Sequence, residues 1–440
     1  MFGYYLRLAL VSMRRNPVLT GLMVLAIAVG IGASMTTLTV LYLLSGDPLP
    51  GKSAHLYFPQ LDPVIGVKYR HTEPEDKMDY RSAVELWASH RADRQALVID
   101  SQLKVRAPDS DKPPTMEQML STTSDFFPMF DVPFQYGSGW SAADDAQQAR
   151  VAVISAELND RLFGGGNSVG RSLRLRDSDV RVIGVLKPWR PAPLFYDVAG
   201  GRYSGGDTAD FYSKPESVFT PVSAGLEIND GAFQQYDCWH VPAVPGHLED
   251  ADCTWVALWV QLDSPAKAEA YRHYLAGYAA QQKSLGRFEN DTTHLRDLMQ
   301  WLDYNGVVPS DVRLQNWLAF AFLAICLSNT VCLLLAKFLR RSTEIGLRRA
   351  LGASRLAVFS QCLVEAGLIG LLGGIGGLLL TLIGLWLVRQ QPVAYAGLAH
   401  LDLAMFSLTL VLAVGVSLAA GLLPAARASR VDPALQLKAL

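Results

Sequence analysis

The stretch LSNTVCLLLAKFLRRSTEIGLRRALGASRLAVFSQCLVEAGLIGLLGGIGG, residues 327–377, decides the fold, because it joins two long apolar runs through a short basic segment. Six cations stand between these runs against a single acid, Glu344: Lys337, Arg340, Arg341, Arg348, Arg349 and Arg355. An apolar run of about 20 residues is long enough to cross a bilayer as a helix, and Lys and Arg collect in loops that stay in the cytoplasm. The stretch therefore predicts a membrane hairpin whose tip lies in the cytoplasm.

Four apolar runs have the length of a membrane span and are predicted to be transmembrane helices: residues 18–44, 316–336, 362–388 and 403–424. The first run is longer than the roughly 7–15 apolar residues of a signal peptide, and no A-x-A cleavage site follows it. We therefore expect it to be retained as a helix. Half of the chain is hydrophobic and only 18% is charged, which is typical of membrane helices combined with globular sequence.

Further cations flank the outer ends of the first and last helices: Arg7, Arg14, Arg15, Arg427, Arg430 and Lys438. The short loop 389–402 contains a single arginine. With four crossings, this distribution predicts that the N-terminal segment 1–17, the segment 337–358 and the tail 425–440 are cytoplasmic. The loop 389–402 and the long insert, residues 45–313, are then extracytoplasmic.

Two stretches look like phosphate-binding loops. GDPLPGKS, residues 46–53, matches the pattern G-x-x-x-x-G-K-[ST]. However, Pro48 and Pro50 have no backbone N–H to offer a phosphate, and the stretch lies on the side of the membrane without ATP. GGGNSVGR, residues 164–171, falls between an expected helix, 155–164, and an expected strand, so a turn is predicted there. We expect no nucleotide site in this chain.

Other functional classes leave no clear pattern. The chain has no H-E-x-x-H motif and no nucleophile–base pairing that is evident from spacing. A net charge of −2 without a concentrated basic face gives no indication of nucleic-acid binding. We therefore expect a non-catalytic chain that binds no cofactor and no metal.

The insert is predicted to fold as an α/β domain. Three segments have the near-alternating apolar residues of strands: 96–107, 180–188 and 254–263. Ser264 is expected to cap a helix. One face of that helix is expected to carry spaced apolar residues: Ala266, Ala270, Tyr274 and Tyr278. A further helix is expected at residues 292–301.

Two cysteines lie in the insert, and three lie in membrane helices: Cys326, Cys332 and Cys362. An oxidising compartment favours a disulfide between Cys238 and Cys253. A bridge that closes about 15 residues would stabilise the fold by ~3 kcal/mol. The alternative is a metal site, because His240 and His247 lie between the two cysteines, although this spacing is uncommon for zinc.

Small residues recur at four-residue spacing in the first and third helices: Ala26, Gly30 and Ser34, Gly370 with Gly374, and Gly373 with Gly377. Such spacing lets helix backbones approach closely in lipid, either inside the bundle or between subunits. Glu365 is the one charged residue in the predicted spans, within about one turn of the cytoplasmic end. Without a chain of buried ionisable groups, we do not expect a proton- or ion-coupled carrier.

The stretch 327–377 resembles the most characteristic segment of MacB/FtsX-type ABC transporter permeases. Its match to the family pattern R-x-x-E-I-G-x-R-x-A-x-G-A, and to the E-A pair that follows, consists of Arg341, Glu344, Ile345, Gly346, Arg348, Ala350, Gly352, Ala353, Glu365 and Ala366. Residues 121–140 and 151–186 resemble the family's periplasmic core domain, and residues 422–440 resemble its C-terminal ending.

The resemblance implies an α-helical membrane protein with four transmembrane helices and a large α/β periplasmic domain of two subdomains inserted between helices 1 and 2. It also implies a permease dimer in the bacterial inner membrane, formed with a second copy or a paralogous permease. MacB itself carries an N-terminal ATPase, whereas here only 17 residues precede the first helix. ATP and Mg are therefore expected on a separate ABC ATPase subunit.

The segment 337–358 is expected to dock on that ATPase. Its apolar residues could enter a groove on a partner while its arginines reach acids or lipid phosphates. The positive-inside rule alone explains most of the charge, but not Glu344 followed by Ile345 and Gly346. The expected coupling residues are Arg341, Glu344, Ile345, Gly346, Leu347, Arg348, Arg349, Ala350, Leu351 and Gly352.

The resemblance implies mechanotransmission, in which ATP hydrolysis drives a conformational change in the periplasm. The leading hypothesis is efflux of a small molecule or peptide with a periplasmic adaptor and an outer-membrane channel. The alternatives are a lipoprotein-releasing permease and an FtsX-like regulator of a periplasmic hydrolase. The large insert favours transport, because FtsX-type regulators usually have a smaller one.

Overall fold

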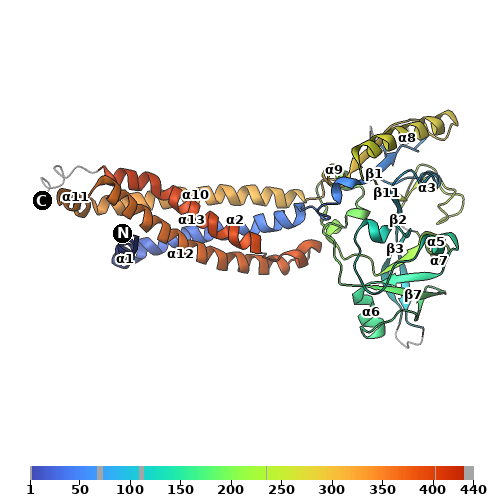
Figure 1. The fold of residues 1–440 in the computed structure, drawn as a ribbon, viewed down its shortest axis with the longest axis horizontal. Helices are drawn as coiled ribbons and strands as arrows, with labels where there is room; N and C mark the ends of the chain where they lie inside the picture. Colours follow the sequence, from blue (N-terminus) through green and yellow to red (C-terminus); the bar gives the residue numbers. More distant parts are fainter. Residues whose placement is uncertain (1, 67–72, 109–112, 234, 402, 431–440) are drawn as a thin grey trace. The chain divides into compact units, whose positions relative to one another are not determined.

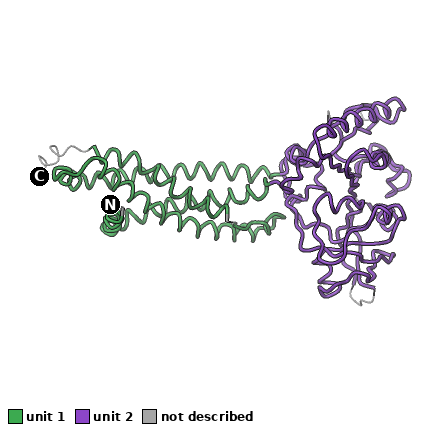
Figure 2. The backbone as a smooth tube through the Cα atoms, viewed as in Figure 1, with its two compact units in different colours: residues 1–46, 308–440 green, residues 47–307 purple. Residues whose placement is uncertain are grey.

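The structure is a computed structural model that describes residues 2–66, 73–108, 113–233, 235–401 and 403–430. The chain divides into unit 1, Met1–Gly46 with Val308–Leu440, and unit 2, Asp47–Val307 (Figure 2). Four helices of unit 1 are long and apolar enough to cross a membrane, and unit 2 is an α/β domain between the first and second of them. The predicted fold class is confirmed.

Unit 1 consists of long helices joined by short connections (Figure 1): α1 Phe2–Arg15, α2 Pro17–Ser45, α10 Ser310–Arg340, α11 Ser342–Ala350, α12 Arg355–Arg389, η5 Ala394–Leu398 and α13 Leu403–Ser429. The spanning helices extend past the predicted apolar runs, because helical hydrogen bonding continues into polar residues that hydropathy does not detect. α12, for example, begins at Arg355 rather than at residue 362. The N-terminal segment forms helix α1, which was not predicted. Residues 431–440 of the predicted tail lie outside the described residues.

Unit 2 is built on a ten-stranded sheet in the order β12-β1-β11-β2-β3-β8-β5-β7-β4, with β6 paired to β2 and β7. The strands are β1 Leu56–Leu61, β2 Arg94–Arg106, β3 Thr115–Thr122, β4 Phe134–Gly137, β5 Val151–Ile154, β6 Ser172–Leu175, β7 Ser178–Leu186, β8 Val218–Pro221, β11 Ala257–Gln261 and β12 Thr293–Asp297. A separate pair joins β9 Asp237–Cys238 to β10 Cys253–Thr254. The helices are η1 Ser53–His55, α3 Tyr80–Ala88, α4 Phe126–Met129, α5 Ala142–Ala146, α6 Ala156–Phe163, η2 Phe195–Asp197, η3 Gly201–Tyr203, η4 Ala209–Tyr212, α7 Val222–Ile228, α8 Pro265–Ser284 and α9 Leu298–Tyr304.

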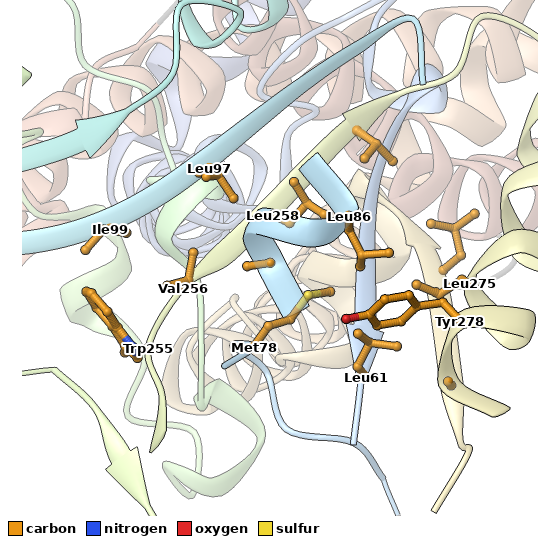
Figure 3. Close-up of a cluster of buried hydrophobic side chains, with 14 of the residues drawn as sticks. Leu61, Met78, Leu86, Leu97, Ile99, Trp255, Val256, Leu258, Leu275 and Tyr278 are labelled. Atoms are coloured by element: carbon orange, nitrogen blue, oxygen red, sulfur yellow. The ribbon is translucent and has the colours of Figure 1, made fainter. Parts of the chain in front are cut away.

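The centre of this sheet is buried on both faces. On β11, Leu258 and Val260 join a cluster with residues of α3 and α8 (Figure 3). Trp259 points to the opposite face, because successive side chains alternate along a strand. There its ring lies 5.1 Å from Phe58, edge to face. Burial on both faces explains why residues 254–263 are nearly continuously apolar.

A second cluster lies around β5, β6 and β7, covered by α6 and α7. The long strand β2 contributes to both clusters, with Leu97 and Ile99 in the first and Leu103 and Val105 in the second. The two predicted subdomains therefore correspond to two cores on one continuous sheet.

Two local predictions in unit 2 were only partly correct. Residues 292–301 were expected to be helical, but β12 pairs along the edge of the sheet with β1 before α9 begins. Ser264 caps α8 as expected, since its Oγ accepts from the Lys267 N–H. Of the four residues predicted for the apolar face of α8, Tyr278 is buried, but the rest of the buried face is different: Ala268, Tyr271, Leu275, Ala279 and Gln282. A strict spacing of four drifts around a helix of 3.6 residues per turn, whereas mixed spacings of three and four stay on one face.

Candidate functional site

The α11 segment, residues 341–354, is held in a fixed turn between α10 and α12. At its end Gly352 has φ +100°, in the left-handed region that favours glycine. The Gly352 N–H donates to the Arg349 carbonyl and the Ala353 N–H to the Arg348 carbonyl, both at 3.1 Å, which closes α11 as a Schellman motif. The Ser354 Oγ then accepts from the Ala357 N–H and caps α12.

The predicted coupling residues fall on two faces of this segment. Ile345 and Gly346 are buried, and Ile345 packs in the core of unit 1. Leu347 and Leu351 are 52% and 80% exposed, and Ala350 and Gly352 are also exposed. The segment therefore presents apolar side chains outward while its other face is anchored in the helix bundle.

Glu344 pairs within its own chain. Its carboxylate lies 3.2 Å from Arg341 and 2.7 Å from Arg348, with Arg15 of α1 at 3.8 Å. Partial burial opposes ionisation of this carboxylate, but the hydrogen bond from Arg341 and the charges of the three arginines outweigh it and lower the pKa of Glu344. Glu344 is therefore ionised at neutral pH and orients two arginines of the segment.

A second and deeper network connects the segment to α12. Glu365 and Lys337 are each 1% exposed, and the Lys337 Nζ lies 2.5 Å from the Glu365 carboxylate. Arg341 reaches the other oxygen of Glu365 at 3.3 Å and donates to the Ser12 Oγ at 2.6 Å. Ser12 donates to Glu365, and Lys337 also lies 3.4 Å from the Thr20 Oγ1. One group of charges therefore joins α1, α2, α10, the α11 segment and α12.

Sequence reasoning missed most of this network. Glu365 was expected near a helix end with access to the interface, but α12 begins ten residues earlier, at Arg355. The Glu365 carboxylate is instead buried against two cations, Lys337 and Arg341. Lys337 was counted as a loop cation, although it lies inside α10. One signal was present: a carboxylate in an apolar helix needs a cation, and Lys337 follows an apolar run directly.

The six predicted packing residues all lie at contacts between helices of the same bundle. The Ser34 Oγ donates to the Ala319 carbonyl of α10 at 3.0 Å. A Cβ added at any of the five glycines would come within 3.0 Å of a side chain of another helix: Gly30 to Cys326, Gly370 to Ser417, Gly373 to Ile27, Gly374 to Ala413 and Gly377 to Ile31. The structure therefore uses these residues inside the bundle, which was one of the two alternatives.

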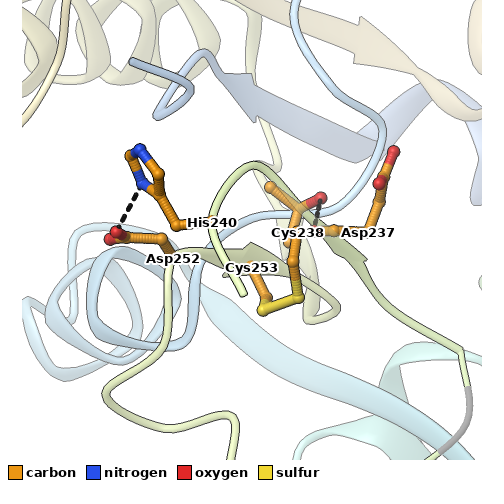
Figure 4. The surroundings of a disulfide bond; sticks show 6 residues. Asp237, Cys238, His240, Asp252 and Cys253 are labelled. Atoms are coloured by element: carbon orange, nitrogen blue, oxygen red, sulfur yellow. Dashed lines mark hydrogen bonds and ion pairs between the residues drawn. A yellow bond between two sulfur atoms is a disulfide. The ribbon is translucent and has the colours of Figure 1, made fainter. Parts of the chain in front are cut away.

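In unit 2 a disulfide joins Cys238 to Cys253, across the β9–β10 pair (Figure 4). His240 Nδ1 lies 2.9 Å from Asp252, and His247 Nδ1 lies 2.9 Å from Asp230. Both sulfurs are used in the bridge and each histidine faces its own carboxylate, so these four residues do not form the alternative zinc site. Among the described ranges, no group of three or more His, Cys, Asp or Glu side chains is placed to hold a metal.

The two stretches that look like phosphate-binding loops have structural roles. Residues 46–53 follow α2 rather than a strand, and Lys52 binds the Asp131 carboxylate at 2.5 Å. Residues 164–171 form the predicted turn between α6 and β6. Sequence reasoning overlooked that this turn also contains the serine-hydrolase pattern G-x-S-x-G, at residues 166–170. The turn leads from a helix into a strand, opposite to a nucleophile elbow. Ser168 is buried and donates to the Asn159 side chain at 2.6 Å.

Unit 2 contains three neighbouring acids, Asp100, Asp197 and Glu216. The Lys77 Nζ lies 2.5 Å from Asp100 and 3.4 Å from Asp197. Burial and the charge of Asp197 raise the pKa of Glu216 to about 8, against a hydrogen bond from the Tyr196 hydroxyl at 2.7 Å. Glu216 is therefore largely protonated at neutral pH.

Comparison with known proteins agrees with this architecture. The model of the MacB-like periplasmic core domain matches residues 20–278, and the model of the FtsX-like permease C-terminal domain matches residues 316–433. The chain belongs to the MacB/FtsX family of ABC transporter permeases. It is accordingly a multi-pass membrane protein with a periplasmic domain, and the resemblance inferred from residues 327–377 is confirmed.

Individual relatives are distant from this permease. The pyoverdine export ATP-binding/permease protein PvdT of Pseudomonas entomophila is 26% identical over 76% of this chain and 44% of its own length. The uncharacterized ABC transporter permease YvrN of Bacillus subtilis is 23% identical over 72% of this chain and 68% of its own length. A crystal structure of the periplasmic region of MacB from Actinobacillus actinomycetemcomitans aligns with a TM-score of 0.35 and 13% identity, over 57% of this chain and 94% of that one. The permease spans less than half the length of PvdT.

Proposed function

We propose that this chain is the permease subunit of an ABC exporter, in which an ABC ATPase binds the α11 segment and drives a conformational change in unit 2. The observation that carries the proposal is that the α11 segment has two different faces, one exposed and apolar and one anchored in the helix bundle. Leu347 and Leu351 are 52% and 80% exposed. The opposite face is connected to four other helices by Glu344, Glu365 and their cations. A push on the exposed face would therefore move several helices together.

In this proposal both termini and the α11 segment are cytoplasmic, in a bacterial inner membrane, and ATP and Mg are bound by the partner. The basic residues near α1 and α11 support this orientation through the positive-inside rule. A second permease copy or a paralogous permease would complete the dimer. Efflux of a small molecule or peptide, with a periplasmic adaptor and an outer-membrane channel, is supported by the export function in the name of PvdT.

Site-specific photo-crosslinking tests the proposed docking surface. A photoreactive amino acid at Leu351 should capture an ABC ATPase in intact cells, whereas the same residue at Met116, an exposed apolar position of unit 2, should not. The variant Leu351→Asp should remain inserted and folded but fail to stimulate ATP hydrolysis. The variant Glu344→Lys should also uncouple the two proteins, because it places a third cation between Arg341 and Arg348. Coupled hydrolysis at the wild-type rate in both variants would refute the proposal.

A reporter inserted after Gly205 tests the orientation independently. Activity of a reporter that works only in the periplasm is expected there. An inactive reporter there, together with activity of a reporter that works only in the cytoplasm, would place unit 2 in the cytoplasm and refute the proposed orientation.

A further inference from the structure

Unit 2 contains a strongly cationic recess that the proposed coupling mechanism does not use. Its volume is about 520 Å³, and it lies among the ends of β2, β3 and β6 and the loop after α7. Its lining includes four cations and one acid: Lys104, Arg106, Arg174, Arg176 and Asp177. We refer to it as the β2–β6 recess.

The strand register brings these cations together. On β2 the buried residues Leu103 and Val105 alternate with exposed Lys104 and Arg106. In the antiparallel pairing of β2 with β6, Arg106 stands directly opposite Arg174. Like charges opposite each other destabilise a pair of strands, so the fold places these two cations at facing positions at a cost.

Arg176 adds a further cation through an unusual backbone conformation. Its φ is +51°, a region that few residues other than glycine, asparagine and aspartate adopt. The Arg176 N–H donates to the Lys104 carbonyl at 2.8 Å, and its guanidinium donates to the Ile228 carbonyl at 3.2 Å. Asn or Gly would suit such a tight turn better, so turn chemistry does not account for an arginine here.

Among the residues that the structure describes, few acids neutralise these charges. Arg174 lies 3.3 Å from Asp179, but neither Lys104 nor Arg106 forms an ion pair with any residue that the structure describes. A concave site with a surplus of one charge attracts counter-ions and ligands of the opposite sign. Arginine in addition offers paired N–H groups that fit carboxylate and phosphate oxygens.

The wall of the recess contains an amide that also lacks partners. Asn229, the residue directly after α7, is 0% exposed, and neither its Nδ2 nor its Oδ1 has a hydrogen-bond partner among the described residues. A buried amide without partners is unfavourable. A ligand that carries both a donor and an acceptor could supply what this amide lacks.

We propose that the β2–β6 recess binds a compact anion with two or more negative charges and a hydroxyl group, such as a hydroxycarboxylate or hydrogen phosphate. Arg106, Arg174 and Lys104 would bind the anionic oxygens, and Asn229 would favour ligands that bear a hydroxyl. The site lies in the periplasmic domain and does not depend on α11 or on an ATPase.

The test uses the full-length protein in nanodiscs at low ionic strength. Citrate and inorganic phosphate are titrated by calorimetry, with acetate at matched ionic strength as the reference. Saturable binding of citrate or phosphate is expected, at least tenfold tighter than acetate. The variant Arg106→Gln should weaken binding at least tenfold. The control variant Arg272→Gln, which changes an exposed cation of α8 paired with Glu269, should change it less than twofold.

A second measurement separates a binding site from a merely structural cluster. Without ligand, Arg106→Gln should raise the melting temperature of unit 2, because it removes a like-charge pair. Citrate should raise the melting temperature of the wild type but not that of the variant. Equal effects of citrate and acetate, or equal loss of binding in the Arg106 and Arg272 variants, would overturn the proposal.

Discussion

The buried pair of Lys337 and Glu365 allows a quantitative test of the network in unit 1. We consider two single variants, Lys337→Met and Glu365→Leu, and the double variant. With an effective dielectric constant of about 20, opposite charges at 2.5 Å and 3.3 Å attract by roughly 7 and 5 kcal/mol. Lys337→Met therefore removes the stronger partner of Glu365 but leaves Arg341 and the hydrogen bond from Ser12.

Removal of one member of a buried pair typically costs about 3–5 kcal/mol, because the other charge is left without compensation. Since Arg341 remains, we expect about 3 kcal/mol for Lys337→Met. Among the described residues, Glu365→Leu leaves the Lys337 ammonium with only the Thr20 hydroxyl as a partner, so a cost of about 3–5 kcal/mol is expected. The double variant removes both charges and should lie within about 1–2 kcal/mol of the wild type.

The assay is reversible unfolding in mixed micelles with increasing mole fraction of denaturing detergent, followed by far-UV circular dichroism. The expected coupling energy is at least about 2 kcal/mol, with each single variant less stable than the double variant. Single variants that each lose under about 1 kcal/mol, or effects that simply add, would refute the inference that this pair is buried and mutually compensated.

Three further predictions concern both units. The folded-state pKa of Glu216 is raised to about 8, so its protonated form stabilises the fold fully below the unfolded-state pKa of about 4.3. This stabilisation is lost as the pH rises toward 8, by up to about 1.4 kcal/mol per pH unit. Glu216→Gln should therefore flatten the dependence of unit 2's melting temperature on pH between pH 5 and 8. Replacing Cys238 and Cys253 by serine should lower the free energy of unfolding of unit 2 by about 3 kcal/mol, measured by denaturant titration, while reducing agent should leave that variant unchanged. Gly370→Val should destabilise unit 1 by about 1–3 kcal/mol in the micelle assay, because even a Cβ would lie 2.1 Å from the Ser417 Oγ; the control Gly415→Ala, with nothing within 4 Å of the added Cβ, should be neutral or slightly stabilising.

The membrane spans could be predicted because hydropathy is a property of a continuous stretch of sequence. The strands β2, β7 and β11 were predictable for the same reason, since their apolar residues are close in the sequence. The contacts that define the candidate site are of another kind. Ser12 and Glu365 are 353 positions apart, and no periodicity in either helix indicates that they meet.

Errors in the sequence reasoning have a common physical origin in tertiary context. Residues 293–297 form a strand because the edge of β1 offers five consecutive pairing positions, which a single-segment pattern does not contain. Glu344 was predicted to be a coupling residue, and that prediction stands untested; what the sequence did not indicate is that three arginines of the same chain surround it. The surplus of positive charge near α11 can be recognised in the sequence, but the pairing of these cations with Glu344 and Glu365 cannot.

A buried ion pair is weak support for stability, because apolar residues of similar volume often stabilise a core as well or better. The double variant at Lys337 and Glu365 is expected to be nearly as stable as the wild type on these grounds, so stability does not explain why the bundle contains these charges. Their geometry offers another explanation, since one carboxylate contacts α10, the α11 segment and α1 at the same time. If the network transmits force from α11, the double variant should insert and fold yet fail to stimulate the ATPase. A double variant that is both stable and fully coupled would show that the exposed face of α11 acts without the network beneath it.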